Sequence, residues 1–231
     1  MARAPRLALA GELHLLLQRG HNRQGVFVDD RDREAYLAML RDAARHYGVA
    51  IHAYVLLDTQ VQLLATPRDA GSLSRLMQSL GRRYVAAFNR RHGRSGTLWE
   101  GRFRAGLLDG AALGPDAMVH VETLPVREGL TGAAGDWPWS SAAHHLGRHR
   151  DPLLTELPAY WSLGNTPFER ELAHAHRLME GVSTAMAEGF ERAAFQGRAV
   201  GSLAFTMRVA DRAGVPVAAK PRGRPARALT R

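Results

Sequence analysis

Apolar residues alternate between strand-like and helix-like spacing over roughly the first 130 positions, and the order of these segments restricts the fold. Runs rich in leucine, valine and aromatic residues predict strands, whereas apolar residues three or four positions apart predict helices. We expect strands at 9–19, 49–57, 60–66 and 97–108, and helices at 29–47, 72–89 and about 115–130.

The predicted order of elements is β-α-β-β-α-β-α. This order favours an α+β fold of ferredoxin-like type, in which helices pack on an antiparallel sheet. The ends of the first helix agree with it, because Asp29-Asp30 can cap the helix and Gly48 can end it. Pro125 must bend or end the last helix, because proline has no backbone N–H.

The chain changes character after Gly147, where a short charged stretch leads into segments with helical spacing separated by glycines. The last residues are rich in proline and basic residues, which predicts a disordered tail. We therefore expect an α+β domain at 1–147, a helical C-terminal extension at 148–213 and a basic disordered tail at 214–231.

Composition excludes several classes of protein. The chain has no cysteine, so disulfides, iron–sulfur clusters and a cysteine nucleophile are excluded. Its apolar runs are too short to span a membrane, and the N-terminus lacks the apolar core of a secretion signal. We expect a soluble cytoplasmic protein without a membrane partner. The formal net charge of +9 favours a polyanionic partner.

Nearly all of the basic residues are arginine, since Lys220 is the only lysine. The planar arginine side chain matches phosphate groups and guanine edges. A GC-rich genome would also favour arginine, but it would not gather the residues in one segment. Between positions 75 and 104 there are eight arginines and a single acid, Glu100.

This basic segment predicts contact with a nucleic-acid backbone. The alternative is a solvated helix face. The expected DNA-contacting residues include one arginine from the turn after the first strand; they are Arg23, Arg82, Arg83, Arg90, Arg91, Arg94, Arg102 and Arg104. Tyr84, Trp99 and Phe103 are interleaved with them and could stack on unpaired bases, or could instead belong to the core.

The tail contains Pro221-Arg222-Gly223-Arg224-Pro225, which is similar to the core of an AT-hook. Glycine lets the backbone approach the floor of a narrow groove, and Arg222 and Arg224 could then reach along an A·T-rich minor groove. The alternative is a basic tail that binds DNA without specificity.

Several short motifs follow one another in an order that resembles a known family. They are Arg19-Gly20-His21-Asn22-Arg23, Phe88-Asn89-Arg90-Arg91-His92-Gly93-Arg94, Trp99-Glu100-Gly101-Arg102-Phe103, Pro125-Val126-Arg127 and Trp137-Pro138-Trp139-Ser140-Ser141. Together they resemble the single-tyrosine HUH transposases, specifically the REP-associated tyrosine transposases, over about residues 5–147. The resemblance implies a protein that cuts and rejoins single-stranded DNA.

In this family a tyrosine attacks a phosphodiester, and a Mg²⁺ or Mn²⁺ ion polarises the scissile phosphate. Two histidines from a His-hydrophobic-His strand motif and an amide four residues after the tyrosine hold the ion. This sequence departs at each of these positions. The strand motif is Gln60-Val61-Gln62, His120 stands at the tyrosine position, and Leu124 stands at the amide position.

These replacements predict a transposase-derived DNA-binding protein that does not cut, acting as a transcriptional regulator. We expect no cofactor and no bound metal, although Gln60 and Gln62 are neutral oxygen donors that could bind Mg²⁺ weakly. The DNA could be a duplex promoter or a hairpin from a palindromic single strand. The oligomeric state is not predicted.

Two other functions remain open. One is a divergent single-stranded DNA endonuclease or strand transferase that uses His120. The other is an RNA-binding or protein-interaction module. The remaining histidine groups do not alter this choice, because no carboxylate lies at a suitable spacing from them; we expect surface or helix positions for His144, His145, His149, His174 and His176. Trp137 and Trp139 are expected to form a packed turn.

Overall fold

The computed structural model of the protein describes residues 7–213. Its first half contains β1 (Leu13–Arg19), η1 (His21–Arg23), α1 (Asp30–Tyr47), β2 (Val49–Leu57), β3 (Gln60–Pro67), α2 (Ser72–Arg91), β4 (Arg104–Leu108) and α3 (Gly110–Glu122). Its second half contains α4 (Leu124–Arg127), η2 (Ala134–Asp136), α5 (Ala142–His145), η3 (Pro158–Leu163), α6 (Pro167–Glu180), α7 (Thr184–Gln196), β5 (Ala199–Val200) and α8 (Leu203–Ala213).

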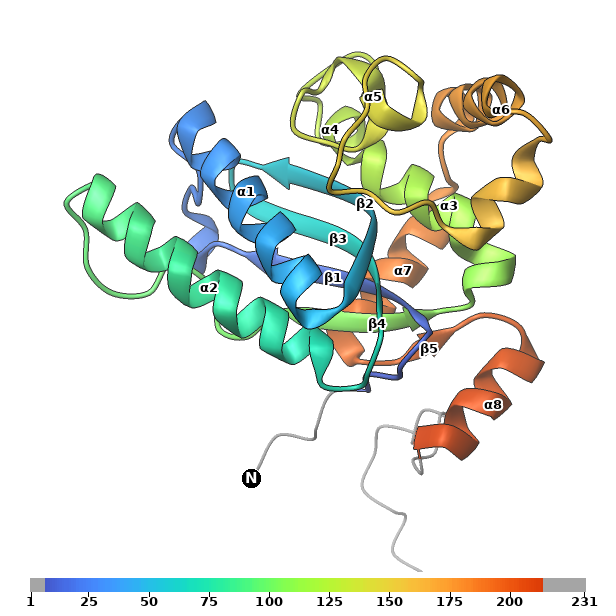
Figure 1. Ribbon diagram of the computed structural model, residues 1–231, viewed down its shortest axis with the longest axis horizontal. Coiled ribbons are helices and arrows are strands. Elements are labelled where there is room, and N and C mark those ends of the chain that lie inside the picture. The colour runs from blue at the N-terminus through green and yellow to red at the C-terminus, as the bar shows by residue number, and fades with distance from the viewer. Residues whose placement is uncertain (1–6, 214–231) are drawn as a thin grey trace, which may run out of the picture.

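One sheet organises the molecule, with the strand order β2-β3-β1-β4-β5 (Figure 1). The first four strands pair antiparallel, which confirms the predicted ferredoxin-like arrangement. The short fifth strand was not predicted. It comes from the C-terminal region and runs parallel to β4, so the complete sheet is mixed rather than purely antiparallel.

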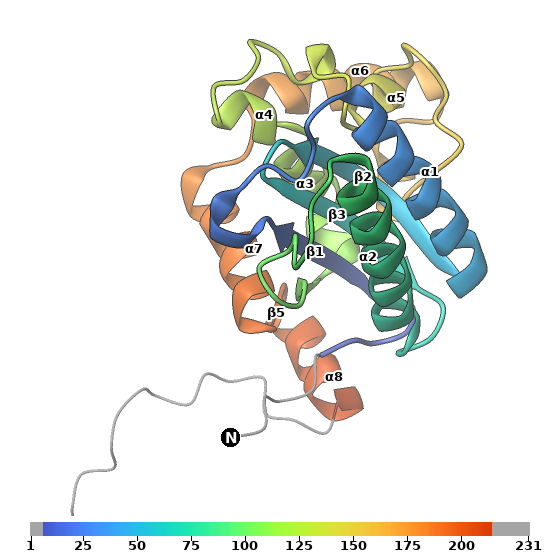
Figure 2. The same ribbon diagram turned by 90° about the vertical axis from the view of Figure 1, so that its left-hand side faces the viewer.

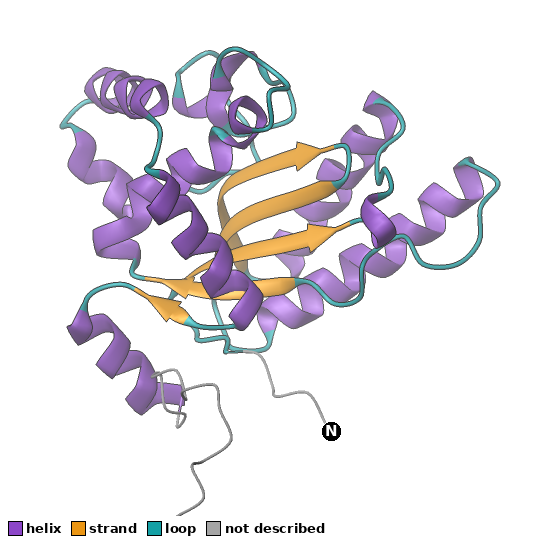
Figure 3. Ribbon diagram, turned by 180° about the vertical axis from the view of Figure 1, so that it is seen from behind, coloured by secondary structure: helices purple, strands orange, loops and turns teal. Residues whose placement is uncertain are grey.

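Both faces of the sheet are apolar, and helices cover each of them. Leu16 of β1 faces the side on which α1 and α2 lie, whereas Leu15 and Leu17 face the opposite side. The second side is covered by α3 and α7. Figure 3 views the molecule from this side, and α7 crosses in front of the sheet there. Alternating side chains of a strand point to opposite faces, so an all-apolar strand requires cover on both.

Local signals fix the helix ends. The Asp29 side chain accepts a hydrogen bond from the Asp32 amide at the start of α1, and Gly48 ends that helix in the left-handed region at φ 64°. In the C-terminal region, Thr166 and Glu169 form a capping box at the start of α6. Ser183 caps α7 in the same way as Asp29 caps α1.

The strand and the helix expected after α2 have other boundaries in the structure. Of the strand expected at 97–108, only β4 is extended in the sheet; the preceding residues form a loop whose Trp99 makes an isolated bridge to Gly20. The helix expected at 115–130 begins earlier, where Asp109 caps it, and is divided at Thr123. Pro125 cannot continue the hydrogen-bond ladder, which agrees with a break at this point.

The C-terminal region at 148–213 is not purely helical, because it contributes β5 to the sheet. It is also not separate from the rest of the fold, because α7 packs against β4. The division of the chain into two regions at residue 147 stays a prediction. The tail at 214–231 lies outside the described residues. Within residues 7–213, no helix is both long and apolar enough to cross a bilayer.

Gly106 is where β4 and α7 approach most closely. A Cβ atom built at this position would lie 2.6 Å from the backbone nitrogen of Ala194 and 2.7 Å from the carbonyl carbon of Ala193. The Gly106→Ala variant should therefore lower the free energy of unfolding by about 2 kcal/mol, because two backbone segments must separate. Chemical denaturation measures this change.

The control is Gly81→Ala in α2, where an added Cβ meets no atom within 4 Å. This substitution should leave stability unchanged or raise it by about 0.5–1 kcal/mol, because alanine favours a helix more than glycine does. Equal stability of the Gly106→Ala variant and the natural chain would contradict the close packing of α7.

Candidate functional site

The glutamines at the strand-motif positions lie at the start of β3, on the sheet face that α3 and α7 cover. Gln60 pairs across the sheet with Arg19, whose Nε donates a 3.3 Å hydrogen bond to Gln60 Oε1. Gln62 pairs with Leu17 on one side and Val55 on the other, and its side chain has no solvent exposure. Neither its Oε1 nor its Nε2 has a hydrogen-bond partner within the described part of the chain.

His120 is buried near the end of α3 and is engaged by Arg127. The Arg127 guanidinium lies 3.0 Å from His120 Nδ1 and also donates to the His120 carbonyl oxygen at 2.9 Å. Because a guanidinium only donates, Nδ1 must accept, and the ring proton therefore resides on Nε2. Burial, helped by the positive charge of Arg127, lowers the pKa of His120 to about 3, so the ring is neutral at pH 7.

Helix α7 covers this end of the sheet face. The Phe190 ring lies edge-on to the His120 ring at 5.4 Å between centroids. Glu191 forms a 3.6 Å ion pair with Arg19, whose guanidinium also lies 4.6 Å from the centre of the Phe195 ring. Phe190 belongs to the same buried cluster as Leu124, which is the residue at the amide position.

The donors at these positions do not fit a divalent metal. Leu124 offers no ligand atom, and the lone pair of His120 accepts a hydrogen bond from Arg127. Gln62, whose neighbours across the sheet are Leu17 and Val55, provides a neutral amide, whereas Mg²⁺ and Mn²⁺ prefer carboxylates and water. The two amide atoms of Gln62 are buried without a hydrogen-bond partner among the described residues, which is costly in free energy.

The predicted DNA-contacting arginines are separated by their partners. Arg82, Arg83 and Arg90 are exposed on α2, and Arg83 lies 3.6 Å from Asp42. Arg91, next to Arg90, is held by carboxylates of α1 and its cap.

The guanidinium of Arg91 lies 2.5 Å from both Asp29 and Asp32. Its hydrogen bond holds the pKa of Asp29 well below the ordinary value. Burial raises the pKa of Asp32, but hydrogen bonds from the Val28 amide, His92 and Arg91 outweigh it and keep this pKa low. Arg91 therefore connects the end of α2 to the start of α1 and is less available to a ligand.

Four other arginines belong to η1, the end of α2 and the loop after α2, and Figure 2 shows this loop beside the first residues after β1. The His21 amide donates to the Leu98 carbonyl oxygen at 2.9 Å, which attaches the loop to η1. We define the basic rim as Arg23, Arg90, Arg94 and Arg102. Within residues 7–213, none of these four forms an ion pair with a carboxylate.

The remaining contacts of these residues leave their charges uncompensated. Arg94 donates to Gln24 Oε1 at 3.2 Å and lies over the Phe88 ring. These contacts orient its guanidinium but do not neutralise its charge. Arg23 is exposed on a left-handed backbone at φ 56°. Arg104 is half-buried, with its guanidinium 5.9 Å from the centre of the Phe195 ring. Arg222 and Arg224 lie outside the described residues.

Of the two alternatives for the interleaved aromatic residues, the structure supports the core and not the stacking surface. Tyr84, Trp99 and Phe103 are all buried, with 1%, 5% and 7% of their surface exposed. The Tyr84 hydroxyl donates to the Val26 carbonyl oxygen at 2.6 Å, and the Tyr84 and Trp99 rings are 6.1 Å apart. These aromatics pack between the sheet and its helices, because their helical and loop positions face the core.

Two of the histidines lie in helices, as expected, but they are buried next to a carboxylate, which the sequence did not predict. His145 and His174 are buried on either side of the Glu122 carboxylate, with Nδ1 of His145 2.5 Å from Oε1 and Nε2 of His174 2.7 Å from Oε2. Burial raises the pKa of Glu122, but the charges of both histidines and their hydrogen bonds hold it below its ordinary value. The three residues are far apart in sequence, so no local spacing reveals them.

The fold and these positions can be compared with known proteins. A solved REP-associated tyrosine transposase bound to a REP hairpin is 18% identical; the match covers 69% of this chain and 93% of that one, with a TM-score of 0.52. A Deinococcus radiodurans R1 protein provisionally assigned as a transposase is 23% identical, covering 45% of this chain and 84% of that one, with a TM-score of 0.35. No family model and no curated protein match the sequence. The chain thus has a fold like that of the REP-associated tyrosine transposases.

The unpartnered amide of Gln62 generates a stability prediction. The Gln62→Met variant keeps a similar side-chain length but removes both buried polar atoms. We expect the free energy of unfolding to rise by about 1–2 kcal/mol, because leaving buried polar groups without partners is costly. Urea denaturation measures the change.

Gln60→Met provides the matched comparison two residues away. Gln60 is half-buried and loses its hydrogen bond with Arg19, so this substitution should be neutral or slightly destabilising. A loss of stability on Gln62→Met would indicate that the amide has a partner in solution, such as a bound water.

Proposed function

We propose that this protein binds DNA through the basic rim and does not cut it. The observation that supports this function is a contrast within one end of the molecule. Four arginines without carboxylate partners are presented around η1 and the end of α2. Of the positions that would carry strand cleavage, Gln62, His120 and Leu124 are instead buried, and Phe190 of α7 packs against His120.

The charge of the rim supports a polyanionic ligand. Arginines that lack internal partners gain most from phosphate, because no existing ion pair must be broken. Their gathering on the segment from η1 to the loop after α2 gives a surface that could follow a nucleic-acid backbone. The basic tail with Arg222 and Arg224 would add further contacts.

A hairpin is the first DNA to test. The similar transposase is bound to a REP hairpin, and the folds agree over most of that protein. Transfer of this ligand class to the present chain is our proposal. A duplex promoter is the other possible target, and a direct competition between the two forms distinguishes them.

The chemistry at His120 supports binding without cleavage. A nucleophile needs an accessible lone pair in line with the phosphorus atom. His120 has no solvent exposure, and its only lone pair accepts a hydrogen bond from Arg127. A protein that occupies DNA without cutting it can act by excluding other proteins, and we propose transcriptional regulation as its role.

Adjacent arginines on α2 test the proposed interface. Arg90→Ala should weaken DNA binding about ten-fold and reduce the slope of log K against log salt by roughly 0.7–0.9, because one phosphate contact is lost. Fluorescence anisotropy with a labelled hairpin, measured at several salt concentrations, gives both values. The melting temperature of this variant should not change, since Arg90 has no ion-pair partner in the described chain.

Arg91→Ala is the matched control. It removes the ion pairs to Asp29 and Asp32 and should lower the melting temperature. Its effect on the salt slope should be small. If Arg90→Ala leaves both affinity and salt slope unchanged, the rim is not the DNA-binding surface.

A cleavage assay tests the second part of the proposal. The purified chain is incubated with end-labelled hairpin DNA and Mn²⁺, and the products are separated on a denaturing gel. We expect neither shortened DNA nor a covalent protein–DNA adduct, because no nucleophile is accessible at the tyrosine position. An adduct that forms with the natural chain and disappears in His120→Ala would overturn the non-cutting function and support a strand transferase.

A further inference from the structure

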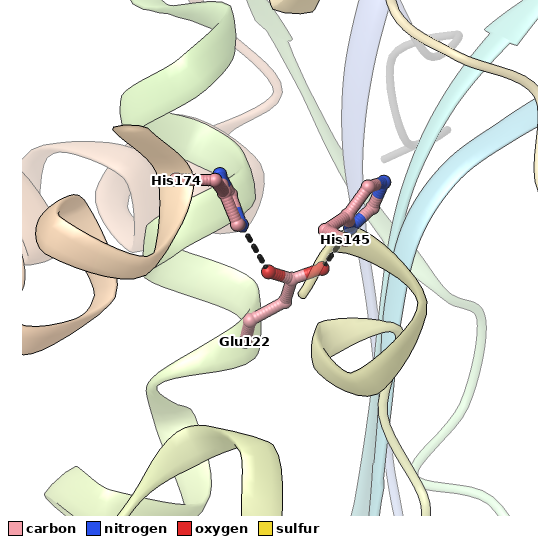
Figure 4. A group of neighbouring side chains, drawn as sticks. All are labelled: Glu122, His145 and His174. Carbon is pink, nitrogen blue, oxygen red and sulfur yellow. Dashed lines mark hydrogen bonds and ion pairs between the residues drawn. The ribbon is translucent and has the colours of Figure 1, made fainter. Parts of the chain in front are cut away.

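A buried cluster of three metal-ligating side chains lies apart from the strand-motif positions. Glu122 ends α3, His145 ends α5 and His174 lies within α6. Their side chains converge on one point, as Figure 4 shows. All three are buried, with 0%, 3% and 0% of their surface exposed, and one ligand atom from each lies within 4.8 Å of the others.

We propose that Glu122, His145 and His174 form a binding site for a divalent transition-metal ion, with Zn²⁺ as the best match. Two imidazole nitrogens and one carboxylate oxygen are a donor set that suits Zn²⁺. The chain has no cysteine, so a zinc site in this protein must use nitrogen and oxygen ligands.

The charge of the cluster favours a cation. A carboxylate removed from solvent needs a compensating positive charge. In the described part of the chain, Glu122 has ion-pair contacts only with the two histidines, and no arginine reaches it. A protonated imidazole can supply this charge, as in the ion pairs described above; when both imidazoles are neutral, a divalent ion would have to supply it.

The present spacing requires only a small opening to admit an ion. Ligand atoms on a tetrahedral zinc ion, with bonds of about 2.0–2.1 Å, lie roughly 3.3 Å apart. The two nitrogen–oxygen distances here are 2.5 Å and 2.7 Å. Each histidine contacts a different oxygen of the carboxylate, so modest rotation of the three side chains would place one oxygen and both nitrogens around a common centre.

Surrounding groups contact all three ligands. The Ser141 hydroxyl donates to Glu122 Oε1 at 2.5 Å, and it also accepts from the Tyr54 amide at 3.0 Å. The Tyr160 ring packs against both imidazoles, at 5.3 Å from His145 and 5.6 Å from His174. Orientation by neighbouring groups of this kind is characteristic of metal ligands. Ser141 Oγ or a water molecule would complete the coordination.

The tautomer of His174 is not fixed by a second partner. Its Nδ1 is buried and has no hydrogen-bond partner among residues 7–213. In the metal-free arrangement the proton on Nε2 points to Glu122. With an ion on Nε2 that proton would leave or move to Nδ1, and no existing hydrogen bond at Nδ1 opposes the change.

The location indicates a structural site. The ligands come from three helices, α3, α5 and α6, and α6 is joined to α3 through this cluster and the Arg177–Asp116 ion pair. Complete burial leaves no room for a substrate. A bound ion would connect α5 and α6 to α3 at Glu122, which lies two residues from His120.

Metal binding by the full chain tests the proposal. The protein is prepared without a polyhistidine tag, stripped with a chelator, and titrated with ZnCl₂ against a chromophoric zinc indicator. We expect one tightly bound ion per chain and a higher melting temperature in the presence of zinc. His174→Gln and His145→Gln should each weaken binding by about 100-fold or more, since loss of a ligand costs at least as much as loss of a supporting group.

His176→Gln is the matched control, because His176 is exposed on the same helix, two residues from His174. It should bind zinc as tightly as the natural chain. The visible spectrum of the Co²⁺-loaded natural chain provides a measurement that needs no variant: intense absorption from a four-coordinate ion is expected.

Two results would overturn the proposal. One is a stripped natural chain that binds no more zinc than the His145→Gln, His174→Gln double variant. The other is a Co²⁺ spectrum identical to that of the free ion. Either would mean that the cluster is a metal-free hydrogen-bonded triad. These measurements do not involve DNA, so their failure leaves the proposed binding function unaffected.

Discussion

A sheet with two apolar faces needs two layers of cover, and this requirement determines the arrangement of the protein. Leu16 on one face and Leu15 and Leu17 on the other come from a single strand, so β1 is buried on both sides. The hydrophobic stabilisation of each face is available only when helices exclude water from it. Helices α1 and α2 do so on one side, and α3 with α7 does so on the other. Helix α7 also packs on His120 through Phe190, which lies in the same buried cluster as Leu124.

The sequence was sufficient for the central fold because local patterns and strand order agree there. The spacing of apolar residues in 29–47 and the cap at Asp29 predict α1 closely, and the four-strand order follows from the predicted succession of elements. The sequence was not sufficient where distant segments decide the structure. Strand β5 has two residues and exists through its pairing with Leu107 and Leu108, so its own composition carries no signal.

The candidate site shows the same division. The replacements at Gln60, Gln62 and Leu124 are visible in the sequence, and the structure adds that their surroundings are buried. Arg90 and Arg91 are identical in sequence terms, yet only Arg91 meets carboxylates that lie about 60 positions away. The Glu122, His145 and His174 cluster could not be predicted either, because its members meet through the packing of three helices and not through a spacing.

Strand β4 and the helix that packs on it are separated by most of the second half of the chain. During synthesis, the part of the sheet that α7 covers at Gly106 therefore remains exposed to solvent until α7 leaves the ribosome. This happens after residue 196 has been added. Leucine-rich strands exposed for that interval favour association with other chains. The nascent polypeptide must then either complete its fold late or be shielded by a chaperone. A chain that ended before α7 would keep this apolar face exposed.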